Sequence, residues 1–424
     1  MKNDFELRYL KKFVFNKTIY FISIFFERSI QFALLPVYTN YLSSSEYGIF
    51  AVAMSALTFL SFISTLGAEN GLYKYNRESQ FQENAAFNSA AICIINSFFL
   101  ATILFALKDY FVKILFLDEK YIYVAIAILI CLVLDSLTKA ALLNFISLEK
   151  SKLYAVLSFV KGVANTLAVF YFVIYLKKGL YGAIISSLLV SLIAAFASGI
   201  IILKNFSLKK IDLKLISNLI QYGFPLALVS ISLTLINFID RYILQFYHGS
   251  SETGIYAASY KIAFSLSYFS SSFSMSILPQ AFELKKRNSN YKDYVKKGAI
   301  KSFYFLIFFS FLIIALAKPI AKIKVFGKHL IHPDYWIGLE LLPWIIVGYI
   351  FYFLYVKYSI FYYVEDKTWK LSIYTFIASI LSIFFYFIFI PSFKSLGAAI
   401  ASCLSFFVLA FLIYVNAPKV NRLV

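Results

Sequence analysis

The sequence has few residues of the kinds that build metal centres and disulfides. It contains three cysteines and three histidines among its 424 residues. Cys93, Cys131 and Cys403 all lie inside apolar runs, where cysteine behaves as a small hydrophobic residue. His329 and His332 share a short segment, but two histidines without a third ligand are a weak zinc signal. We therefore expect no disulfide, no metal site and no other cofactor.

A nucleotide-hydrolysing site is also missing. Gly327-Lys328 is followed by His329 in place of the Ser or Thr of a phosphate-binding loop, and no glycine-rich stretch precedes it. The segments between the apolar runs do not exceed about twenty residues, which leaves no room for a catalytic domain outside the membrane. These absences argue against an ATPase and against a membrane enzyme such as a polysaccharide polymerase or ligase.

Charge is scarce and apolar residues are abundant. Charged residues make up 14% of the chain and hydrophobic residues 61%, and the mean hydropathy is +0.78. Long, nearly uncharged runs recur from end to end, a pattern typical of membrane helices. The net charge of +19 does not indicate a nucleic-acid partner, because the charges lie between the apolar runs and not along one face. We expect the chain to lie in a lipid bilayer.

Twelve runs are long enough to cross a bilayer as helices. Most have about 20–30 residues, which suffices for ~30 Å of hydrocarbon at 1.5 Å per residue. The first run follows a basic N-terminus and is too long for the apolar core of a signal peptide, so we expect no cleaved signal. The predicted helices comprise residues 13–42, 49–71, 85–107, 121–147, 153–176, 179–203, 217–246, 254–281, 298–317, 336–361, 369–390 and 395–416.

The distribution of Lys and Arg predicts the orientation of these helices. Of the forty basic residues, 24 lie in the two tails and in the segments on their side, ten lie in the opposite segments, and six lie inside the predicted helices. Basic residues favour the cytoplasmic side, so both termini are expected in the cytoplasm. The segment 318–334 is an exception with four lysines on the opposite side, and a place at the membrane interface would explain it.

One short sequence occurs twice. Residues 45–52 read Ser-Glu-Tyr-Gly-Ile-Phe-Ala-Val, and residues 251–258 read Ser-Glu-Thr-Gly-Ile-Tyr-Ala-Ala, at an offset of 206. A second pair of similar sequences, at residues 182–187 and 397–402, has an offset of 215. Two such pairs at nearly the same offset indicate that the chain consists of two related halves, which is typical of transporters.

The two halves are expected to be parallel. Six predicted helices precede the second copy, so both halves enter the membrane from the same side and are related by an axis along the membrane normal. We predict an N-terminal six-helix bundle in residues 1–204, a cytoplasmic linker in 205–216 and a C-terminal six-helix bundle in 217–424. The fold class is thus an all-α membrane protein with about twelve transmembrane helices in two parallel bundles around a central cavity.

Three basic residues within the predicted helices are candidate substrate ligands. A charge at the bilayer centre costs ~2.5–3.5 kcal/mol or more, so each one calls for an explanation. Arg28 lies near the middle of the first helix, and its guanidinium suits bidentate binding of phosphate or carboxylate. Lys261 and Lys161 lie about seven or eight residues inside their helices. Positive charge in a water-filled cavity attracts an anionic ligand, so we predict that these three residues bind substrate.

The other charged residues within the predicted helices have two interpretations, a structural one and one in ion coupling. Asp135 and Lys139 are one turn apart, so they can pair on one face of their helix. Asp240 and Arg241 lie in the outer third of the helix 217–246 and can fix its end. These pairs are either structural or part of ion coupling, in which Glu27, Asp135 and Asp240 are the candidate protonatable groups.

Several segments resemble those of polysaccharide and O-antigen flippases of the Wzx type. Residues 35–48, Leu-Pro-Val-Tyr-Thr-Asn-Tyr-Leu-Ser-Ser-Ser-Glu-Tyr-Gly, resemble the end of the first helix of that family. Tyr-Gly-Phe-Pro at 222–225, Ile-Asp-Arg-Tyr-Ile-Leu at 239–244 and Gly-Ile-Tyr at 254–256 resemble the start of its second half. The resemblance extends over nearly the whole chain.

The resemblance implies a fold and a function. Such proteins belong to the superfamily of drug/ion antiporters and the lipid II flippase, with two six-helix bundles around a central cavity. They move an undecaprenyl-pyrophosphate-linked oligosaccharide from the cytoplasmic to the outer leaflet by alternating access. Basic residues recur in helices 1, 2 and 8 of related flippases. Arg28 and Lys261 would play the parts in helices 1 and 8, whereas the predicted helix 49–71 has no deep basic residue and departs from that pattern.

The resemblance also implies a location and partners. It places the chain in a bacterial cytoplasmic (inner) membrane, with a polyprenyl-linked glycan as substrate and other polysaccharide-assembly membrane proteins as partners. The alternative is a cation-coupled multidrug exporter of the same superfamily, which would need an acidic, apolar cavity for cationic drugs. The balance of charge within the predicted helices is basic, so a flippase is expected.

Overall fold

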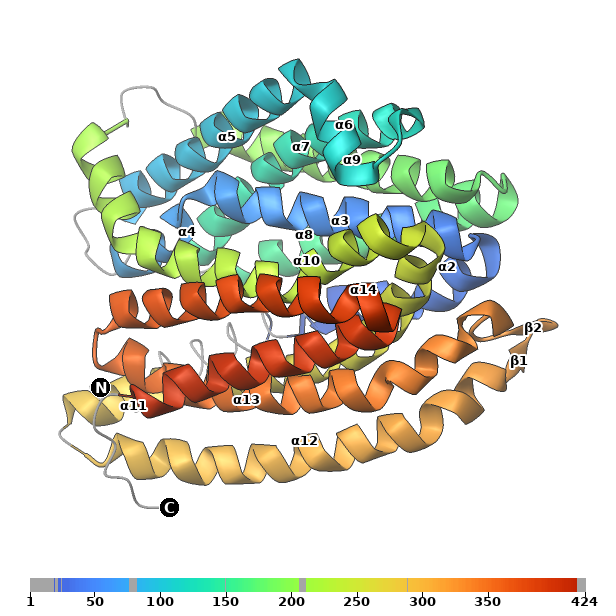
Figure 1. Cartoon of the computed structure of the whole chain (residues 1–424). Coiled ribbons are helices and arrows are strands. Elements are labelled where there is room, and N and C mark those ends of the chain that lie inside the picture. Colours follow the sequence, from blue (N-terminus) through green and yellow to red (C-terminus); the bar gives the residue numbers. More distant parts are fainter. Residues whose placement is uncertain are drawn as a thin grey trace. The chain divides into compact units, whose positions relative to one another are not determined.

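The structure is a computed structural model, and almost every described residue lies in a helix (Figure 1). The predicted beginning of the first helix at residue 13 and part of the predicted linker 205–216 lie outside the described residues. The described residues are 19, 22–23, 25–75, 82–148, 150–205, 211–287 and 289–417.

The first half of the chain contains helices throughout its described part. Residues 25–33 are helical and lead into α2. The elements that follow are α2 (Leu35–Tyr41), α3 (Ser44–Thr65), α4 (Ala68–Tyr75), α5 (Gln82–Ala106), α6 (Lys108–Phe116), the 3-10 turn η1 (Glu119–Tyr121), α7 (Ile122–Ser147), α8 (Ser151–Val169), the π-helical turn η2 (Phe170–Tyr175) and α9 (Gly179–Asn205).

The second half adds one small hairpin to its helices. Its two short strands follow α12 and pair antiparallel. The elements are α10 (Leu213–Phe264), α11 (Leu266–Lys286), α12 (Tyr291–Lys322), β1 (Lys324–Val325), β2 (Lys328–His329), the 3-10 segment η4 (Pro333–Leu341), α13 (Leu342–Val364) and α14 (Thr368–Val415).

The predicted transmembrane helices are helical in most of their described residues, but the predicted helix 49–71 is broken at Leu66–Gly67, between α3 and α4. Nine helical segments of the described residues are long and apolar enough to cross a membrane. Two of them, Leu213–Lys286 and Thr368–Val415, contain 74 and 48 residues, which is enough for two crossings each. The first is broken at Gly249 (φ 83) and the second at Lys394 (φ 53). With residues 25–41, these segments account for the twelve predictions, and the fold is an all-α membrane fold.

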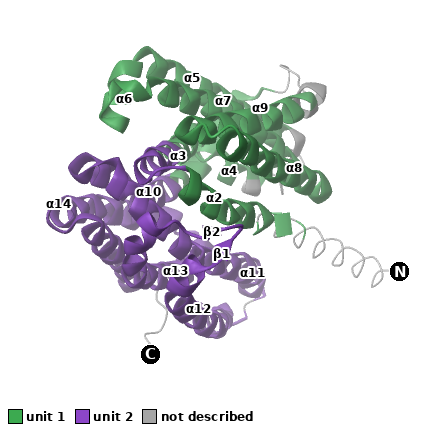
Figure 2. Cartoon of the chain, turned by 90° about the vertical axis from the view of Figure 1, so that its right-hand side faces the viewer, with its two compact units in different colours: residues 1–41, 56–227 green, residues 42–55, 228–424 purple. Residues whose placement is uncertain are grey.

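The chain forms two compact units (Figure 2). The first unit contains the described residues up to Tyr41 together with Ala56–Ala227, and the second contains Leu42–Ser55 together with the described residues from Leu228 onward. One boundary falls between α2 and α3, and the other two fall inside α3 and α10. Each of these two helices therefore contributes one end to each unit.

The core of the first unit joins α4, α5, α7 and the start of α10. Leu66 (φ 46) and Gly67 (φ 78) separate α3 from α4, and a Cβ at Gly67 would overlap the backbone of Gly223. Only glycine allows so close an approach. The apolar side chains buried around this point are Ala68, Leu72, Ala85, Ala86, Ile92, Cys93, Leu143, Leu215 and Leu219.

The second unit has a core rich in buried tyrosine. Its most extensive packing is between α13 and α14. A tyrosine hydroxyl inside an apolar core needs a hydrogen-bond partner, and six buried tyrosine hydroxyls of this unit donate to oxygen atoms of the same unit. The largest fully buried tyrosines are Tyr256, Tyr260, Tyr335, Tyr349, Tyr362 and Tyr386.

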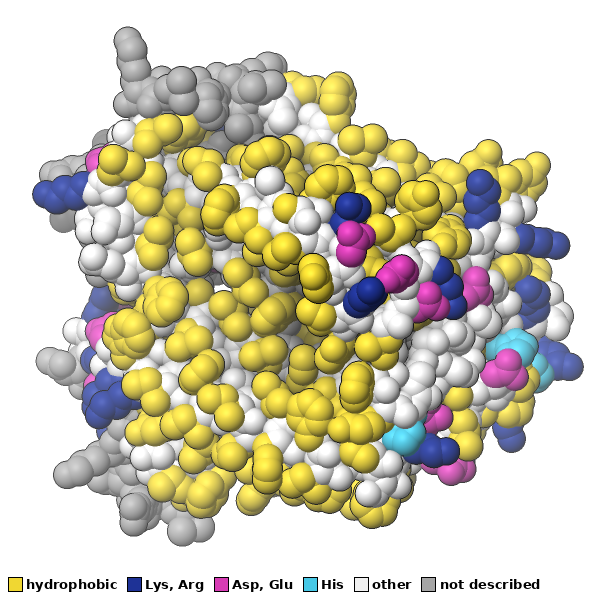
Figure 3. Space-filling model, turned by 45° about the horizontal axis from the view of Figure 1, so that its top comes forward, with side chains coloured by type: hydrophobic (Ala, Val, Ile, Leu, Met, Phe, Trp, Pro, Cys, Tyr) yellow, Lys and Arg dark blue, Asp and Glu magenta, His cyan; other side chains and the backbone are white. Residues whose placement is uncertain are grey.

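The exterior agrees with a membrane location. Figure 3 shows hydrophobic side chains over the middle of the visible face, while most charged and histidine side chains lie toward its ends. Large apolar side chains such as Phe196, Tyr304 and Phe311 are more than 70% exposed. Apolar surface of this extent is exceptional on a soluble protein and is suited to lipid.

Candidate functional site

In the first unit, Lys161 of α8 forms an ion pair with Glu27. The Nζ to Oε1 distance is 3.8 Å, and each side chain is 30% exposed. The neighbouring residues hold the two helices together, since Phe26 and Phe159 stack with ring centroids 4.9 Å apart. A Cβ at Gly162 would lie 2.8 Å from Cδ1 of Ile30, so the missing side chain lets the helix of residues 25–33 approach α8 closely.

A second carboxylate lies near this ion pair. Asp135 of α7 accepts a hydrogen bond of 2.9 Å from the Ser191 hydroxyl of α9. The positive charge of Lys161 is stabilised by both Asp135 and Glu27. Lys161 therefore has a carboxylate partner and does not present an uncompensated positive charge.

Arg28 lies beside this cluster in the sequence. It is half-buried on the helix of residues 25–33, and successive side chains of a helix point about 100° apart. Arg28 therefore points away from the direction in which Glu27 meets Lys161.

The predicted pairing of Asp135 with Lys139 is wrong. Lys139 pairs instead with Glu69 in the first turn of α4, at 3.1 Å, and its ammonium lies 5.4 Å from the centroid of the Phe62 ring. Asp135 is held by Ser191 on another helix. The prediction rested on the spacing of Asp135 and Lys139 along one helix. In the structure, Lys139 has its partner on α4 and Asp135 has its partner on α9.

Glu69 is a charged residue of this unit that the sequence analysis missed. It follows the break at Leu66–Gly67, which starts α4 and places the carboxylate against α7. The Asn96 amide donates to the carbonyl oxygens of Ile63 and Ser64, at 3.3 and 2.9 Å. It thereby supplies a hydrogen-bond donor to the last carbonyl groups of α3, which have no partner within the helix. The Leu-Gly pair was the available signal, because a glycine with positive φ commonly ends a helix.

In the second unit, Asp240 and Arg241 are completely enclosed. The guanidinium Nη1 lies 3.5 Å from Oδ1 of Asp240 and donates to the Asn237 carbonyl at 2.7 Å. The backbone N of Arg241 donates to Oδ1 at 2.7 Å, and the Tyr256 hydroxyl donates to Oδ2 at 2.5 Å. Both carboxylate oxygens thus have a donor, which a buried charge requires.

Aromatic rings complete the surroundings of Arg241. The Cζ atom lies 4.9 Å from the ring centroid of Phe238 and 4.5 Å from that of Tyr260. The hydroxyls of Tyr260 and Tyr349 each donate to Oδ1 of Asn237 at 3.2 Å. Because these groups satisfy one another, the geometry favours the structural reading of the Asp240–Arg241 pair.

Lys261 lies on the later part of α10, directly after Tyr260, whose hydroxyl belongs to this network. It is half-buried. The carboxylate of Asp240 is already bound by Arg241 and Tyr256. An anion that reached the ammonium of Lys261 would be stabilised.

The repeated glycine motif forms a crossing within the second unit. A Cβ at Gly48 would overlap the carbonyl oxygen of Ser250, and a Cβ at Gly254 would overlap that of Ser44. The hydroxyls of Ser44 and Ser251 lie 2.6 Å apart. The two copies of the repeat therefore pack on each other as equivalent partners, at the start of α3 and just after the break at Gly249.

The part of the chain that the structure describes is expected to lack a metal site. Among the residues that the structure describes, no group of three or more His, Cys, Asp and Glu side chains could hold a metal ion. The histidines of the predicted His-x-x-His pair are used locally. His329 Nδ1 lies 2.9 Å from the Lys322 carbonyl oxygen, and His332 Nδ1 lies 3.3 Å from an Asp334 carboxylate oxygen.

Comparison with known families gives one match. The family described as "Polysaccharide biosynthesis protein" matches residues 13–285. No curated protein sequence matches the chain.

Solved structures share the fold at low identity. An inward-facing multidrug resistance MATE family transporter of the MOP superfamily superposes with a TM-score of 0.75 at 12% identity, over 92% of this chain and 93% of that one. The lipid II flippase MurJ in an inward closed conformation gives 0.72 at 16% identity, over 93% and 86%. A MOP superfamily transporter from Pyrococcus furiosus gives 0.62 at 13% identity, over 94% of both chains.

Proposed function

The chain belongs to the polysaccharide biosynthesis protein family, and we propose that it is a flippase for an undecaprenyl-pyrophosphate-linked oligosaccharide. It carries this substrate from the cytoplasmic to the outer leaflet. The proposal is supported by the family, by the all-α membrane fold, and by the similarity of that fold to a protein named as a lipid II flippase. A pyrophosphate head group is anionic, so its passage through apolar surroundings requires cations from the protein.

The observation that carries the proposal is that Lys261, a half-buried lysine, and Arg241 both lie on α10, within an apolar span of the second unit. Asp240 is engaged by Arg241 and Tyr256. A ligand phosphate would be attracted by the ammonium of Lys261, whereas a cationic drug would be repelled by it. The MOP transporter from Pyrococcus furiosus is described by a reverse polarity of its binding pocket, so pocket charge varies among proteins with this fold.

The proposed mechanism is alternating access. The bundle of residues 1–204 and the bundle of residues 217–424 rock about the linker 205–216, with the head group in a central cavity and the polyprenyl tail in lipid. Lys261 and Arg28 bind the pyrophosphate. Lys161 joins them when the phosphate displaces Glu27, whose ion pair with Lys161 is long at 3.8 Å and partly exposed.

A second candidate function is a cation-coupled multidrug exporter. The observation that favours it is the pair of carboxylates, Glu27 and Asp135, around the single ammonium of Lys161. Protonation of one carboxylate could couple either kind of transport to an ion gradient. The two functions differ in the charge of the cargo, which makes them separable by experiment.

The proposal includes a location and partners. The chain acts in a bacterial cytoplasmic membrane with both termini in the cytoplasm, beside other membrane proteins of polysaccharide assembly, and carries out no covalent chemistry itself. In cells that depend on it, replacement of Arg28 by Ala should abolish surface glycan while the protein remains in the membrane. Normal surface glycan in that variant would contradict the assignment of Arg28 to the substrate-binding site.

A reconstituted system tests the function directly. The purified chain is placed in vesicles with a fluorescent polyprenyl-pyrophosphate oligosaccharide, and the label in each leaflet is measured with a membrane-impermeant quencher. A flippase increases the exchange between leaflets above that of protein-free vesicles. A cationic dye is offered in parallel, and movement of the dye without movement of the lipid-linked sugar would favour the exporter.

A further inference from the structure

The hairpin between α12 and η4 is a small, fixed projection of the second unit (Figure 1). Lys324 pairs with His329 and Val325 pairs with Lys328. The two residues of the turn, Phe326 and Gly327, have φ of 50° and 79°. Two positive φ values in a two-residue loop are those of a type I′ turn. We call residues 322–330 the finger.

Phe326 is an unusual residue for the tip of the finger. Type I′ turns prefer Asn, Asp or Gly, and a bulky side chain with positive φ is strained. The side chain is 102% exposed, so it buries no apolar surface that would offset this strain. Folding alone does not account for an aromatic residue here, which points to a partner outside the chain.

The finger carries excess positive charge. Residues 318–340 contain four lysines and two acidic residues. Both acids are engaged, because Glu340 pairs with Lys318 at 3.3 Å and Asp334 lies 3.3 Å from His332. The three lysines nearest the tip are Lys322, Lys324 and Lys328.

The loop around α6 shows the opposite arrangement. Residues 108–120 contain three lysines and three acidic residues. All six are used in local ion pairs, which are Lys108–Asp109 at 4.0 Å, Lys113–Glu119 at 2.7 Å and Lys120–Asp118 at 2.7 Å. A lysine-rich loop of this protein can therefore have no net charge. Residues 318–340, which include the finger, have a net positive charge.

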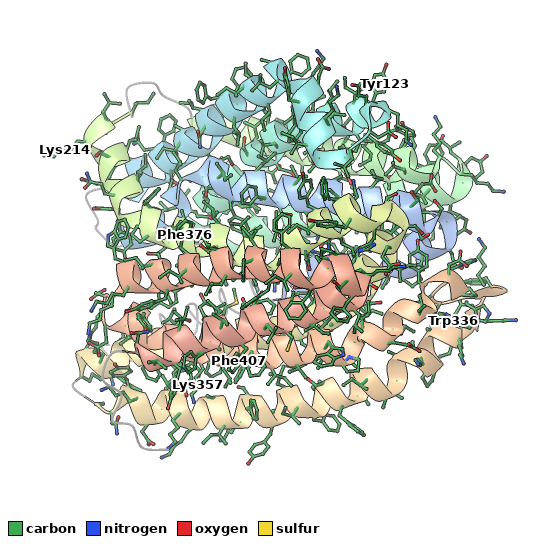
Figure 4. All side chains as sticks on the ribbon, in the orientation of Figure 1. Tyr123, Lys214, Trp336, Lys357, Phe376 and Phe407 are labelled. Carbon is green, nitrogen blue, oxygen red and sulfur yellow. The ribbon has the colours of Figure 1, made fainter. Side chains whose placement is uncertain are left out.

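A tryptophan supports the base of the finger (Figure 4). Trp336 donates from Nε1 to the Ile331 carbonyl at 2.9 Å. Lys322 Nζ lies 5.5 Å from the Trp336 ring centroid, and the His329 ring meets it edge-on at 5.2 Å. Tryptophan with basic neighbours is typical of the membrane–water interface.

The finger continues the lipid-facing surface of α12. Only 17% of the most apolar stretch of α12 is buried in the protein, the lowest share among the nine spans of the described residues. This exposed apolar surface runs on into the finger through Ile323, Val325 and Phe326, which are 51%, 44% and 102% exposed. The exposed apolar residues along α12 include Tyr304, Phe305, Phe308, Phe311, Leu316 and Ile320.

From these contacts we infer that the finger binds the anionic phospholipid surface of the leaflet at this end of α12. Phe326 inserts among the lipid head groups, and Lys322, Lys324 and Lys328 bind the lipid phosphates. Aromatic insertion combined with basic residues is the usual chemistry of attachment to an anionic leaflet. With both termini in the cytoplasm, this is the outer leaflet.

Quenching by lipid measures the insertion. The full-length Phe326→Cys variant is labelled with bimane, since Cys93, Cys131 and Cys403 are buried. Ser289→Cys, in the exposed turn before the other end of α12, is the matched control. In vesicles with brominated lipid, the label at 326 should lose fluorescence and the label at 289 should not, and the loss should be larger with phosphatidylglycerol than with phosphatidylcholine alone. Equal quenching at the two positions, or no effect of lipid charge, would overturn the proposal.

Two further variants separate lipid binding from folding. Phe326→Asn suits the turn, so it should melt at the same or a higher temperature in detergent but retain less phosphatidylglycerol after purification. Replacing Lys322, Lys324 and Lys328 by Gln should lower retention several-fold, while the same change at Lys108, Lys113 and Lys120 should not. Unchanged retention in the finger variants, or selective retention of polyprenyl pyrophosphate in place of phosphatidylglycerol, would contradict the proposal.

Discussion

Gly48 and Gly254, which occupy the same position in the two copies of the repeat, lie backbone against backbone. A Cβ at Gly48 would be 3.0 Å from the backbone N of Gly254, and a Cβ at Gly254 would be 2.9 Å from that of Gly48. Each would also overlap a carbonyl oxygen of the other copy. The two copies of the repeat therefore reflect a duplication and also contact each other directly. This contact requires glycine in both copies.

Gly48→Ala and Gly254→Ala should each lower the melting temperature in detergent. The added methyl group meets backbone, which cannot rotate away, so we expect a loss of about 1–3 kcal/mol or more. Gly199→Ala is the control, because a Cβ there would meet no described atom within 4 Å and alanine is the better helix former. An equal loss in all three variants would mean that the crossing has no special role.

The crossing should open during transport if the two halves of the chain rock. Ser44 and Ser251, with hydroxyls 2.6 Å apart, can be replaced together by cysteine. Oxidation should then stop movement of the lipid-linked sugar, and a reductant should restore it. The two single-cysteine variants should be insensitive to oxidant. Full transport by the cross-linked protein would show that this contact persists throughout the cycle.

Lys139 and Glu69 should be energetically coupled, and Lys139 and Asp135 should not. A double-mutant cycle with Lys139→Met and Glu69→Gln should give a coupling of about 0.5–1 kcal/mol, since the pair is only partly buried. The cycle with Lys139→Met and Asp135→Asn should give a value near zero. Melting in detergent measures both cycles, and a larger coupling to Asp135 would restore the pairing that helix spacing predicts.

The sequence predicted the positions of most membrane spans, because a run of apolar residues along the chain is enough to indicate a segment buried in lipid or protein. It could not predict which side chains meet. Lys139 had an acidic neighbour one turn away, yet its partner, Glu69, is seventy residues distant in the chain. The interfacial place expected for residues 318–334 remains a prediction, now made specific by the hairpin and by the exposed Phe326.

Stability should fall in acid through Glu365, at the turn after α13. The hydrogen bond from the Tyr291 hydroxyl, at 2.5 Å, and the charge of Lys285 lower the pKa of Glu365 below its ordinary value. Because the folded pKa is the lower one, this stabilisation is complete above an unfolded pKa of about 4.3 and is lost as the pH falls through the folded value.

The Tyr291→Phe variant isolates this contribution. It should melt at a lower temperature than the wild type near neutral pH, and the difference should shrink as the pH falls below about 4. Tyr123→Phe, at an exposed position, should match the wild type throughout. A difference between Tyr291→Phe and the wild type that does not change with pH would assign the loss to packing.

The central claim is that Lys261 binds the anionic head group of a lipid-linked oligosaccharide. The most direct test is the rate at which the Lys261→Ala variant moves a fluorescent polyprenyl-pyrophosphate oligosaccharide across reconstituted vesicles, compared with Lys357→Ala. Lys357 is also a half-buried lysine of a membrane span, but its ammonium lies 4.6 Å from the Tyr358 ring centroid. The account predicts at least a tenfold loss for Lys261→Ala, which corresponds to about 1.4 kcal/mol, and near-normal transport for Lys357→Ala. Equal rates in the two variants would contradict it.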